Sequence, residues 1–133
     1  MIHFTPSPEG LSAEFYAECA QGRLSFQRCD DCGTWRHPPR VMCTKCGSWK
    51  WAWTPSCGRG SIYTWTVTHQ PLHPAFAGAT PYAVVVVEME EGVRLVSGVV
   101  DLPLERLALG LPVEVVFEKA SAAIGLHFFR PRG

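Results

Sequence analysis

The sequence predicts a mainly β protein in which an N-terminal helix precedes a small cysteine-rich ribbon and a five-stranded barrel. Three observations support this prediction: apolar residues at helical spacing near the N-terminus, two Cys-x-x-Cys pairs, and five strand-like runs after residue 60. The chain has 133 residues, of which 47% are hydrophobic, so it is long enough to bury a core. We expect an N-terminal helical segment at 1–23, the ribbon at 24–54 and the barrel at 55–133.

Charge and composition narrow the class of protein. Charged residues make up 18% of the chain, below the usual share of roughly a quarter, which predicts a surface that is partly covered by a partner. Twelve basic and twelve acidic residues give no net charge, which argues against binding to nucleic acid or anionic membranes through overall charge. No apolar run is long enough for a membrane span, and the start Met1–Phe4 lacks the features of a signal peptide. We therefore expect a cytoplasmic protein.

The first element is predicted to be a helix. Ser7, Pro8 and Glu9 offer an N-cap, a first-turn proline and a first-turn acid. Leu11, Phe15 and Cys19 follow at helical spacing, and Gly22 marks the end. On this face Cys19 is expected to be a small buried residue rather than a reactive thiol.

The next segment carries a pattern typical of a metal site. After a short strand at Leu24–Arg28, two Cys-x-x-Cys pairs follow with ten residues between them, namely Cys29, Cys32, Cys43 and Cys46. A tight turn can aim both thiolates of a pair at one ion, and two such turns complete a closed tetrahedral site. Gly33 and Gly47 supply positive φ just after each pair. Because disulfides are disfavoured in the cytosol and no βαβ pattern suggests a redox dithiol, we expect a rubredoxin-like ribbon holding a structural zinc; iron uses the same ligands and remains possible.

The remainder of the chain is predicted to be strands. Trp49, Trp51 and Trp53 alternate on one face of a strand. The five later runs are Ser61–His69, Tyr82–Met89, Val93–Val100, Pro112–Lys119 and Ile124–Phe129, with a helical turn at Leu102–Leu107. Five strands with a helical turn after the third match the OB-fold barrel, with an SH3-like barrel as the main alternative. The loop from Gln70 to Thr80 is long enough to suggest a functional loop.

Charge is divided between the two halves. Residues 23–50 carry six basic and two acidic side chains, whereas residues 88–118 carry seven acidic and two basic ones. A basic ribbon beside an acidic barrel could bind an anionic ligand or a partner. The run Ala83–Val87 is apolar on both faces of its strand, which predicts cover on both sides, either by a partner or by a helix of this chain.

The order of these features resembles the zinc-ribbon/OB-fold acyl-CoA-associated protein family, formerly a domain of unknown function. The residues that carry the resemblance are Phe15-Tyr16, Gly22-Arg23-Leu24, Cys29-Asp30-Asp31-Cys32-Gly33, Pro38-Pro39-Arg40, Cys43-Thr44-Lys45-Cys46-Gly47, Gly58-Arg59-Gly60 through His69, and Leu109–Val113. The resemblance implies a non-catalytic small subunit of a thiolase-fold enzyme that acts on acyl-CoA, including steroid side-chain aldolases. It also implies that this chain helps to shape the CoA or acyl channel while the partner supplies the catalytic groups. Because the chain has few charges and many aromatics, we expect the barrel strands around Tyr82–Val87 to pack against a thiolase-type dimer, which gives an α2β2 complex.

Candidate ligand contacts follow from the chemistry of CoA. Its phosphates need cationic groups, for which the candidates are Arg36, Arg40 and Arg59, and the acyl or pantetheine passage could be lined by His69, His73 and Phe76. Cys57 is not part of the family pattern and is interpreted as a spare thiol.

Two other functions remain open at this point. Trp49, Trp51, Trp53, Tyr63 and Trp65 could stack the bases of single-stranded nucleic acid, as OB-folds commonly do. An independent enzyme could use His69, His73 and Cys57, although no acid is placed to orient either histidine.

Overall fold

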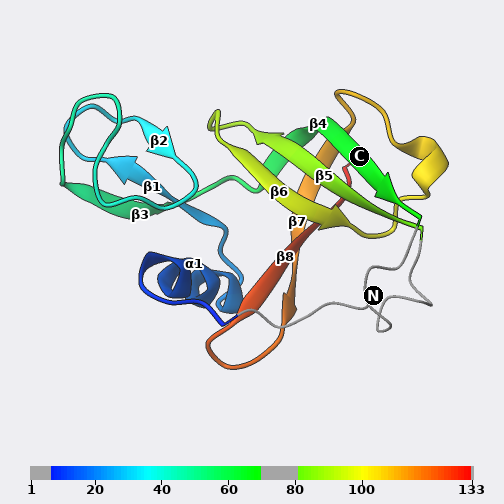
Figure 1. Cartoon of the computed structure of the whole chain (residues 1–133), viewed down its shortest axis with the longest axis horizontal. Coiled ribbons are helices and arrows are strands. Elements are labelled where there is room, and N and C mark those ends of the chain that lie inside the picture. Colours follow the sequence, from blue (N-terminus) through cyan, green and yellow to red (C-terminus); the bar gives the residue numbers. More distant parts are fainter. Residues whose placement is uncertain (1–6, 70–80, 133) are drawn as a thin grey trace.

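The architecture consists of one helix, a small sheet and a closed barrel (Figure 1). The computed structural model describes residues 7–69 and 81–132. Helix α1 spans Leu11–Ala20. The ribbon contains β1 (Ser25–Cys29), β2 (Trp35–Arg36) and β3 (Trp51–Pro55), and the barrel contains β4 (Arg59–Thr68), β5 (Tyr82–Met89), β6 (Arg94–Val99), β7 (Pro112–Lys119) and β8 (Gly125–Pro131), with a 3-10 turn at Leu104–Arg106.

Helix α1 presents the predicted face but begins later than expected. Phe15 and Cys19 are its buried residues, which confirms the apolar spacing. The prediction of an N-cap at Ser7 is wrong, because Gly10 has a φ of 58° and no side chain caps the helix. A left-handed residue interrupts the helical backbone, so Pro8 and Glu9 lie before the first turn.

The ribbon forms a three-stranded antiparallel sheet in the order β2-β1-β3. Gln27 in the central strand faces Arg36 on one side and Trp53 on the other. The expectation of three alternating tryptophans is only partly met, because β3 starts at Trp51 and Trp49 lies before the strand with 69% of its surface exposed. Trp51 and Trp53 contact edge to face, with ring centroids 5.3 Å apart.

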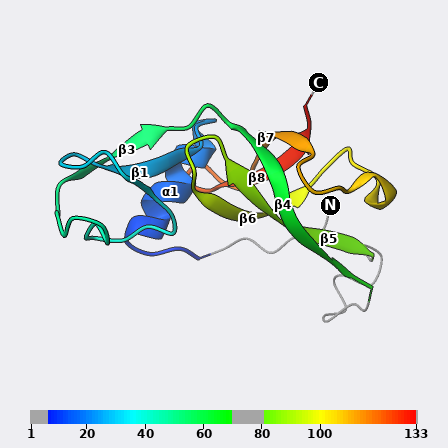
Figure 2. The same ribbon diagram turned by 90° about the horizontal axis from the view of Figure 1, so that it is seen from above.

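The barrel closes in the order β4-β5-β6-β8-β7. All neighbours are antiparallel except β6 and β8, which run parallel where Gly98 pairs with Phe128. This is the predicted five-stranded OB-fold with a helical turn after its third strand. Seen from above, the ribbon and the barrel occupy opposite ends of the molecule, with α1 at the ribbon end (Figure 2); the helix contacts β8 and β7 of the barrel and β1 of the ribbon.

The core lies inside the barrel and continues under α1. Strand β5 alternates, with Val85 and Val87 fully buried, and Phe129 of β8 is also fully buried. Helix α1 lies against β8 so closely that a Cβ at Gly125 would come within 2.4 Å of the backbone of Ala20. Only glycine fits at this contact, which fixes the helix beside the barrel and next to the ribbon.

Candidate functional site

The four predicted metal ligands lie together at the end of the ribbon. Their Sγ atoms are all within 4.8 Å of one another, with 3.6 Å between Cys29 and Cys46 and 3.7 Å between Cys32 and Cys43. A tetrahedral zinc with Zn–S bonds of about 2.3 Å separates its sulfurs by about 3.8 Å. The four cysteines are therefore positioned to bind one metal ion, and a set of four protein ligands leaves no open position for catalysis.

The two cysteine turns repeat the same backbone geometry. The Cys29 N–H donates to the Thr34 carbonyl at 2.9 Å, and the Cys43 N–H donates to the Ser48 carbonyl at 2.8 Å. Gly33 and Gly47 follow each pair with φ values of 74° and 77°, in the left-handed region that glycine tolerates. The local sequence thus builds both halves of the site in the same way.

A buried polar network holds the ribbon tip in place. The fully buried Gln27 accepts hydrogen bonds from the Arg36 Nε at 3.0 Å and the Arg40 backbone N–H at 2.7 Å. Its Nε2 donates to the Arg40 carbonyl at 2.8 Å, and Arg36 Nη2 donates to that same carbonyl at 2.7 Å. The two predicted contact residues Arg36 and Arg40 are therefore neighbours, joined through a glutamine that sequence reasoning did not identify.

Arg36 is a buried cation whose charge is not paired. Only 8% of its surface is exposed, and its recorded hydrogen-bond acceptors are the neutral oxygens of Gln27 and Arg40. Its Nη1 has no hydrogen-bond partner, and the guanidinium lies 5.7 Å from the Trp51 ring centroid. Within the described part of the chain no carboxylate forms an ion pair with it, so its positive charge is not neutralised at the ribbon tip.

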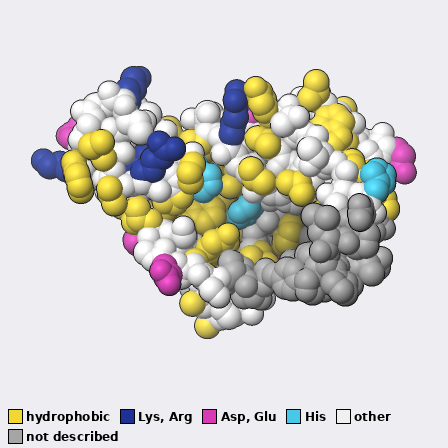
Figure 3. Space-filling view, viewed as in Figure 1, with side chains coloured by type: hydrophobic (Ala, Val, Ile, Leu, Met, Phe, Trp, Pro, Cys, Tyr) yellow, Lys and Arg dark blue, Asp and Glu magenta, His cyan; other side chains and the backbone are white. Residues whose placement is uncertain are grey.

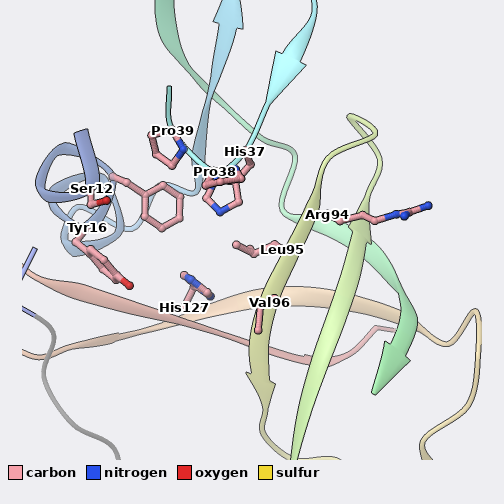
Figure 4. A pocket seen from close by; sticks show the side chains of 10 residues that line it. Ser12, Tyr16, His37, Pro38, Pro39, Arg94, Leu95, Val96 and His127 are labelled. Carbon is pink, nitrogen blue, oxygen red and sulfur yellow. The ribbon is translucent and has the colours of Figure 1, made fainter. Parts of the chain in front are cut away.

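A trough separates the ribbon tip from the barrel, and it consists of two adjoining cavities. The first, which we term the apolar pocket, has a volume of about 360 Å³ and walls that include Phe15, Tyr16, Leu95 and Val96 (Figure 4). The second, the cationic pocket, has a volume of about 450 Å³ and is lined by Trp35, Arg36, Arg40, Thr44 and Gly92, among others. His37 and Arg94 line both cavities. In the space-filling view, a hollow with histidine and hydrophobic side chains on its walls lies between the two ends of the molecule (Figure 3).

Two neutral histidines face the apolar pocket. Burial lowers the pKa of His37 and of His127 to about 4 in each case, and in His127 the nearby His37 adds to this. The Ser97 hydroxyl lies 3.0 Å from the His127 carbonyl, to which it donates, and 2.8 Å from Nδ1 of the same residue. Because a hydroxyl has one proton, Nδ1 is then the donor to Ser97, which leaves Nε2 of His127 as a hydrogen-bond acceptor.

This serine–histidine pair does not have the geometry of an activated nucleophile. Ser97 is buried, with 8% of its surface exposed, and its proton is directed to a backbone carbonyl. Tyr16 also lines the pocket, and its hydroxyl points toward His127 (Figure 4). Burial raises the pKa of Tyr16, so it remains protonated at neutral pH. Tyr16, His37 and His127 come from three distant segments, and no sequence spacing could have identified them as a group.

The other predicted contact residues lie elsewhere. Arg59 begins β4, where it forms an ion pair with Glu90 at 3.3 Å, and it does not line the trough. His69 is exposed just after the end of β4. His73 and Phe76 lie outside the described residues.

Cys57 has surroundings that disfavour its thiolate. Its Sγ lies 3.2 Å from a carboxylate oxygen of Glu90, and its N–H donates to Glu91 at 3.0 Å. Partial burial, followed by these two acids, raises the pKa of the thiol. A protonated thiol is a weak nucleophile, and within the described segments no histidine contacts it, so the arrangement gives no support to an enzyme based on Cys57.

The aromatic residues proposed for base stacking are divided between the two halves of the molecule. Trp51 and Trp53 belong to β3, and the Trp53 Nε1 donates to Glu14 of the helix at 3.0 Å. Tyr63 lies on the barrel, where the Arg94 guanidinium covers its ring at 3.8 Å. They do not form one continuous stacking surface of the kind that single-stranded nucleic acids need.

No helix among the described residues is both long and apolar enough to cross a membrane.

Comparison with known proteins gives matches over most of the chain. Residues 17–51 match the family described as "ChsH2, rubredoxin-like zinc ribbon domain", and residues 53–118 match "ChsH2, C-terminal OB-fold domain". The chain is 42% identical over 118 residues to a probable enoyl-CoA hydratase alpha subunit of Thermomonospora curvata, covering 88% of this chain and 36% of the relative. It is 31% identical over 112 residues to the 3-oxo-4,17-pregnadiene-20-carboxyl-CoA hydratase alpha subunit of Mycobacterium tuberculosis, covering 84% of this chain and 35% of the relative. The chain thus spans about a third of the length of these two curated relatives.

One solved structure is similar over nearly the whole length of both chains. It is described as "Ltp2-ChsH2(DUF35) aldolase", has a TM-score of 0.85 and 38% sequence identity, and the match covers 95% of this chain and 98% of that one. Ribbon, barrel and their order are therefore shared. This chain belongs to the ChsH2 (DUF35) family of zinc-ribbon and OB-fold proteins.

Proposed function

We propose that this chain is the small, non-catalytic subunit of a thiolase-fold enzyme that acts on acyl-CoA thioesters. The observation that carries the proposal is the similarity to a chain of an Ltp2–ChsH2 aldolase over 98% of that chain's length. A match of this extent leaves no large segment of either chain unaccounted for, so the two chains suit the same role in a complex.

The surface of the barrel supports a role in assembly. On the outer face of β5 and β6, Val86 pairs with Val96 and Val84 lies beside them, and Val96 is 62% exposed. Among the described residues α1 does not supply this cover, because it packs mainly against β7, β8 and β1. Monomers seldom leave large apolar patches open to water, and we assign this face to the thiolase-fold partner in an α2β2 complex in the cytoplasm.

The substrate class follows from the relatives. Two of them are named as alpha subunits of hydratases for CoA thioesters, one of these with a steroid-derived acyl group, and the similar structure is named an aldolase. We propose cleavage or formation of a carbon–carbon bond in a CoA ester, for example retro-aldol cleavage of a steroid side chain, with this chain stabilising the enzyme and helping to shape the CoA channel.

The proposed cofactor is a structural Zn²⁺ bound by Cys29, Cys32, Cys43 and Cys46. The closed set of four thiolates and the family description of a zinc ribbon support zinc. Metal analysis of the purified protein distinguishes zinc from iron.

Co-expression with the thiolase-fold protein encoded by a neighbouring gene tests the function. Light scattering after size-exclusion chromatography should give the mass of two copies of each chain, and the complex should cleave a steroid side-chain CoA ester while this chain alone does not. A stable monomer at high concentration, without affinity for any thiolase-fold partner, would overturn the proposal. Salt-sensitive binding to single-stranded DNA in that case would favour the nucleic-acid alternative.

A paired substitution tests the proposed interface. Val84→Glu places a charge on the exposed face of β5, outside the trough, and should abolish the complex, because a carboxylate would be buried without a partner. Leu109→Glu is the matched control, since Leu109 is 73% exposed in a turn away from β5 and β6. Both variants should keep the melting temperature of the parent chain. If Leu109→Glu alone breaks the complex, the interface lies on another face, although the accessory role stands.

A further inference from the structure

The trough between ribbon and barrel is not used by the metal centre, and of the residues of the proposed β5–β6 interface only Val96 borders it, at one wall of the apolar pocket. Its two cavities differ in character, with aromatic and aliphatic walls at α1 and guanidinium groups at the ribbon tip. They share His37 and Arg94, so one extended ligand can pass from the first to the second along a continuous surface. Each volume reaches the lower part of the range that small-molecule sites occupy.

Among the polar groups of the apolar pocket, which also include Ser12 and His37, Tyr16 and His127 offer a donor and an acceptor for hydrogen bonds. The Tyr16 hydroxyl points into the pocket toward His127 (Figure 4), and Nε2 of His127 is an acceptor because Nδ1 is bonded to Ser97. Both groups are uncharged at neutral pH. A secondary amide has the complementary pair, a carbonyl to accept from Tyr16 and an N–H to donate to His127. The apolar walls then favour an uncharged ligand that carries such an amide.

The cationic pocket requires an anion beside that amide. Arg36 is a nine-tenths buried cation without a carboxylate partner in the described chain, and the exposed Arg40 lies next to it through the Gln27 network. The Arg94 guanidinium does not contribute, because it covers the Tyr63 ring and forms an ion pair with Glu88 at 3.3 Å, and its side chain points away from Tyr16 and His127 (Figure 4). An uncompensated buried charge is costly, and a bound phosphate would neutralise it.

We propose that the trough binds the phosphopantetheine arm of CoA, with a pantetheine amide between Tyr16 and His127 and a phosphate group at Arg40. The buried Arg36, which lies next to Arg40, attracts the phosphate by its charge without contacting it. His37, which lines both cavities, lies where the amide and the phosphate portions of the ligand meet. This inference rests on the proposed function, which supplies acyl-CoA as the ligand class. A main-chain amide of the partner would satisfy Tyr16 and His127 equally well, but an ordinary peptide carries no anion to match Arg36 and Arg40.

Calorimetry on the full zinc-loaded chain tests this proposal with two probes, CoA and pantetheine. Tyr16→Phe removes one hydroxyl and should weaken both CoA and pantetheine by about fivefold, the value of one neutral hydrogen bond. Arg40→Gln keeps the backbone bonds to Gln27 and should weaken CoA by about tenfold or more while leaving pantetheine unchanged, since a charged hydrogen bond is stronger than a neutral one.

Two matched variants control for non-specific effects. Tyr63→Phe removes a hydroxyl on the outer barrel, and Lys50→Gln removes a positive charge from the ribbon outside the trough. Neither should change the affinity for any probe by more than about twofold. The assignment is overturned if the wild-type protein binds no CoA at millimolar concentration, or if Tyr16→Phe and Arg40→Gln both bind CoA as tightly as the wild type does.

Measurement of complex formation separates this inference from the proposed function. If the chain binds CoA in the trough but no thiolase-fold subunit, the proposed function fails and the site stands. If the complex forms and CoA binding is insensitive to both trough variants, the site fails and the function stands. If Tyr16→Phe weakens the complex but not CoA binding, a partner main chain occupies the pocket, which also overturns the CoA assignment.

Discussion

The stability of the ribbon depends on a few residues that bind a metal or each other. Strand β3 has no fully buried residue, and the largest fully buried side chains of the ribbon are Phe26 and Gln27. Such a small core cannot offset the conformational entropy of ordering the loops. The remaining stabilisation must come from the metal, because a structural site forms only when the chain folds around it.

Removal of one thiolate should therefore release the metal. Cys43, which is 1% exposed, is the most informative choice, and Cys43→Ser should lose the bound ion and unfold residues 24–50 while the barrel stays folded. Metal analysis and amide spectra of the two regions measure both effects. Cys57→Ser is the matched control and should retain one equivalent of metal. Retention of a full equivalent by Cys43→Ser, with a native melting curve, would contradict the assignment of the four ligands.

Features that depend on neighbouring residues in the sequence could be predicted, because their geometry is local. The spacing of the cysteines places four thiolates together, and the apolar runs identify all five strands of the barrel with errors of only a few residues at their ends. The helix start was missed because the propensity of Ser7 and Pro8 to begin a helix is overridden by the left-handed Gly10. Local propensity is a weak guide wherever one residue adopts an unusual backbone conformation.

The trough could not be predicted, because three remote segments form it. Tyr16 comes from α1, His37 from the ribbon tip and His127 from β8, and nothing in their sequence neighbourhoods distinguishes them from surface or core residues. Arg36 and Arg40 were identified from charge alone, whereas the buried Gln27 that positions them has no signal in a single sequence. Sequence patterns give the elements, and only the packing of elements against each other gives the site.

At the level of elements, the buried histidines His37 of the ribbon tip and His127 of β8 make the stability of the folded protein sensitive to acid. Their folded pKa values of about 4 lie below the unfolded value of about 6.5, so the folded state favours the neutral rings. Their contribution to stability is complete above pH 6.5 and is lost as the pH falls from there toward 4. We expect the free energy of unfolding to decrease by about 5 kcal/mol across this range, with about half from each histidine, as measured by urea unfolding of the zinc-loaded protein.

Single substitutions separate the contribution of the two buried histidines to the pH dependence of stability from the contributions of other titratable groups. His127→Gln and His37→Gln should each flatten the decrease between pH 6.5 and 5, whereas His69→Gln, at an exposed position, should not. The carboxylates with lowered pKa values, such as Glu18 and Glu90, lose their contribution only at lower pH and do not interfere. An unchanged slope in both buried-histidine variants would rule out this explanation and point to proton competition at the cysteine thiolates.

At the scale of the whole molecule, α1 joins two units that would otherwise contact little. Phe15 is 4% exposed and reaches both sides, with its ring 6.5 Å from Phe26 of the ribbon and 5.7 Å from His127 of the barrel, measured between centroids. A second connection runs from the Ser56 N–H to the Leu24 carbonyl at 2.7 Å and from the Ser56 hydroxyl to Glu91. Cooperative unfolding of the chain should therefore depend on Phe15 more than its size alone implies.

Phe15→Ala tests this dependence. Truncation of a buried phenylalanine costs about 3–5 kcal/mol, and at this position we expect the loss to divide unfolding into two transitions, because the ribbon and the barrel no longer share a packed side chain. Phe129→Ala, which removes a fully buried ring inside the barrel, is the matched control and should destabilise the barrel without uncoupling the ribbon from it. Hydrogen exchange measures the difference directly: in Phe15→Ala the amides of β1 should exchange well before those of β5. If the amides of both strands still exchange together in Phe15→Ala, the ribbon and the barrel are coupled through the Ser56 connection instead. Helix α1 then packs on the barrel without coupling its unfolding to that of the ribbon.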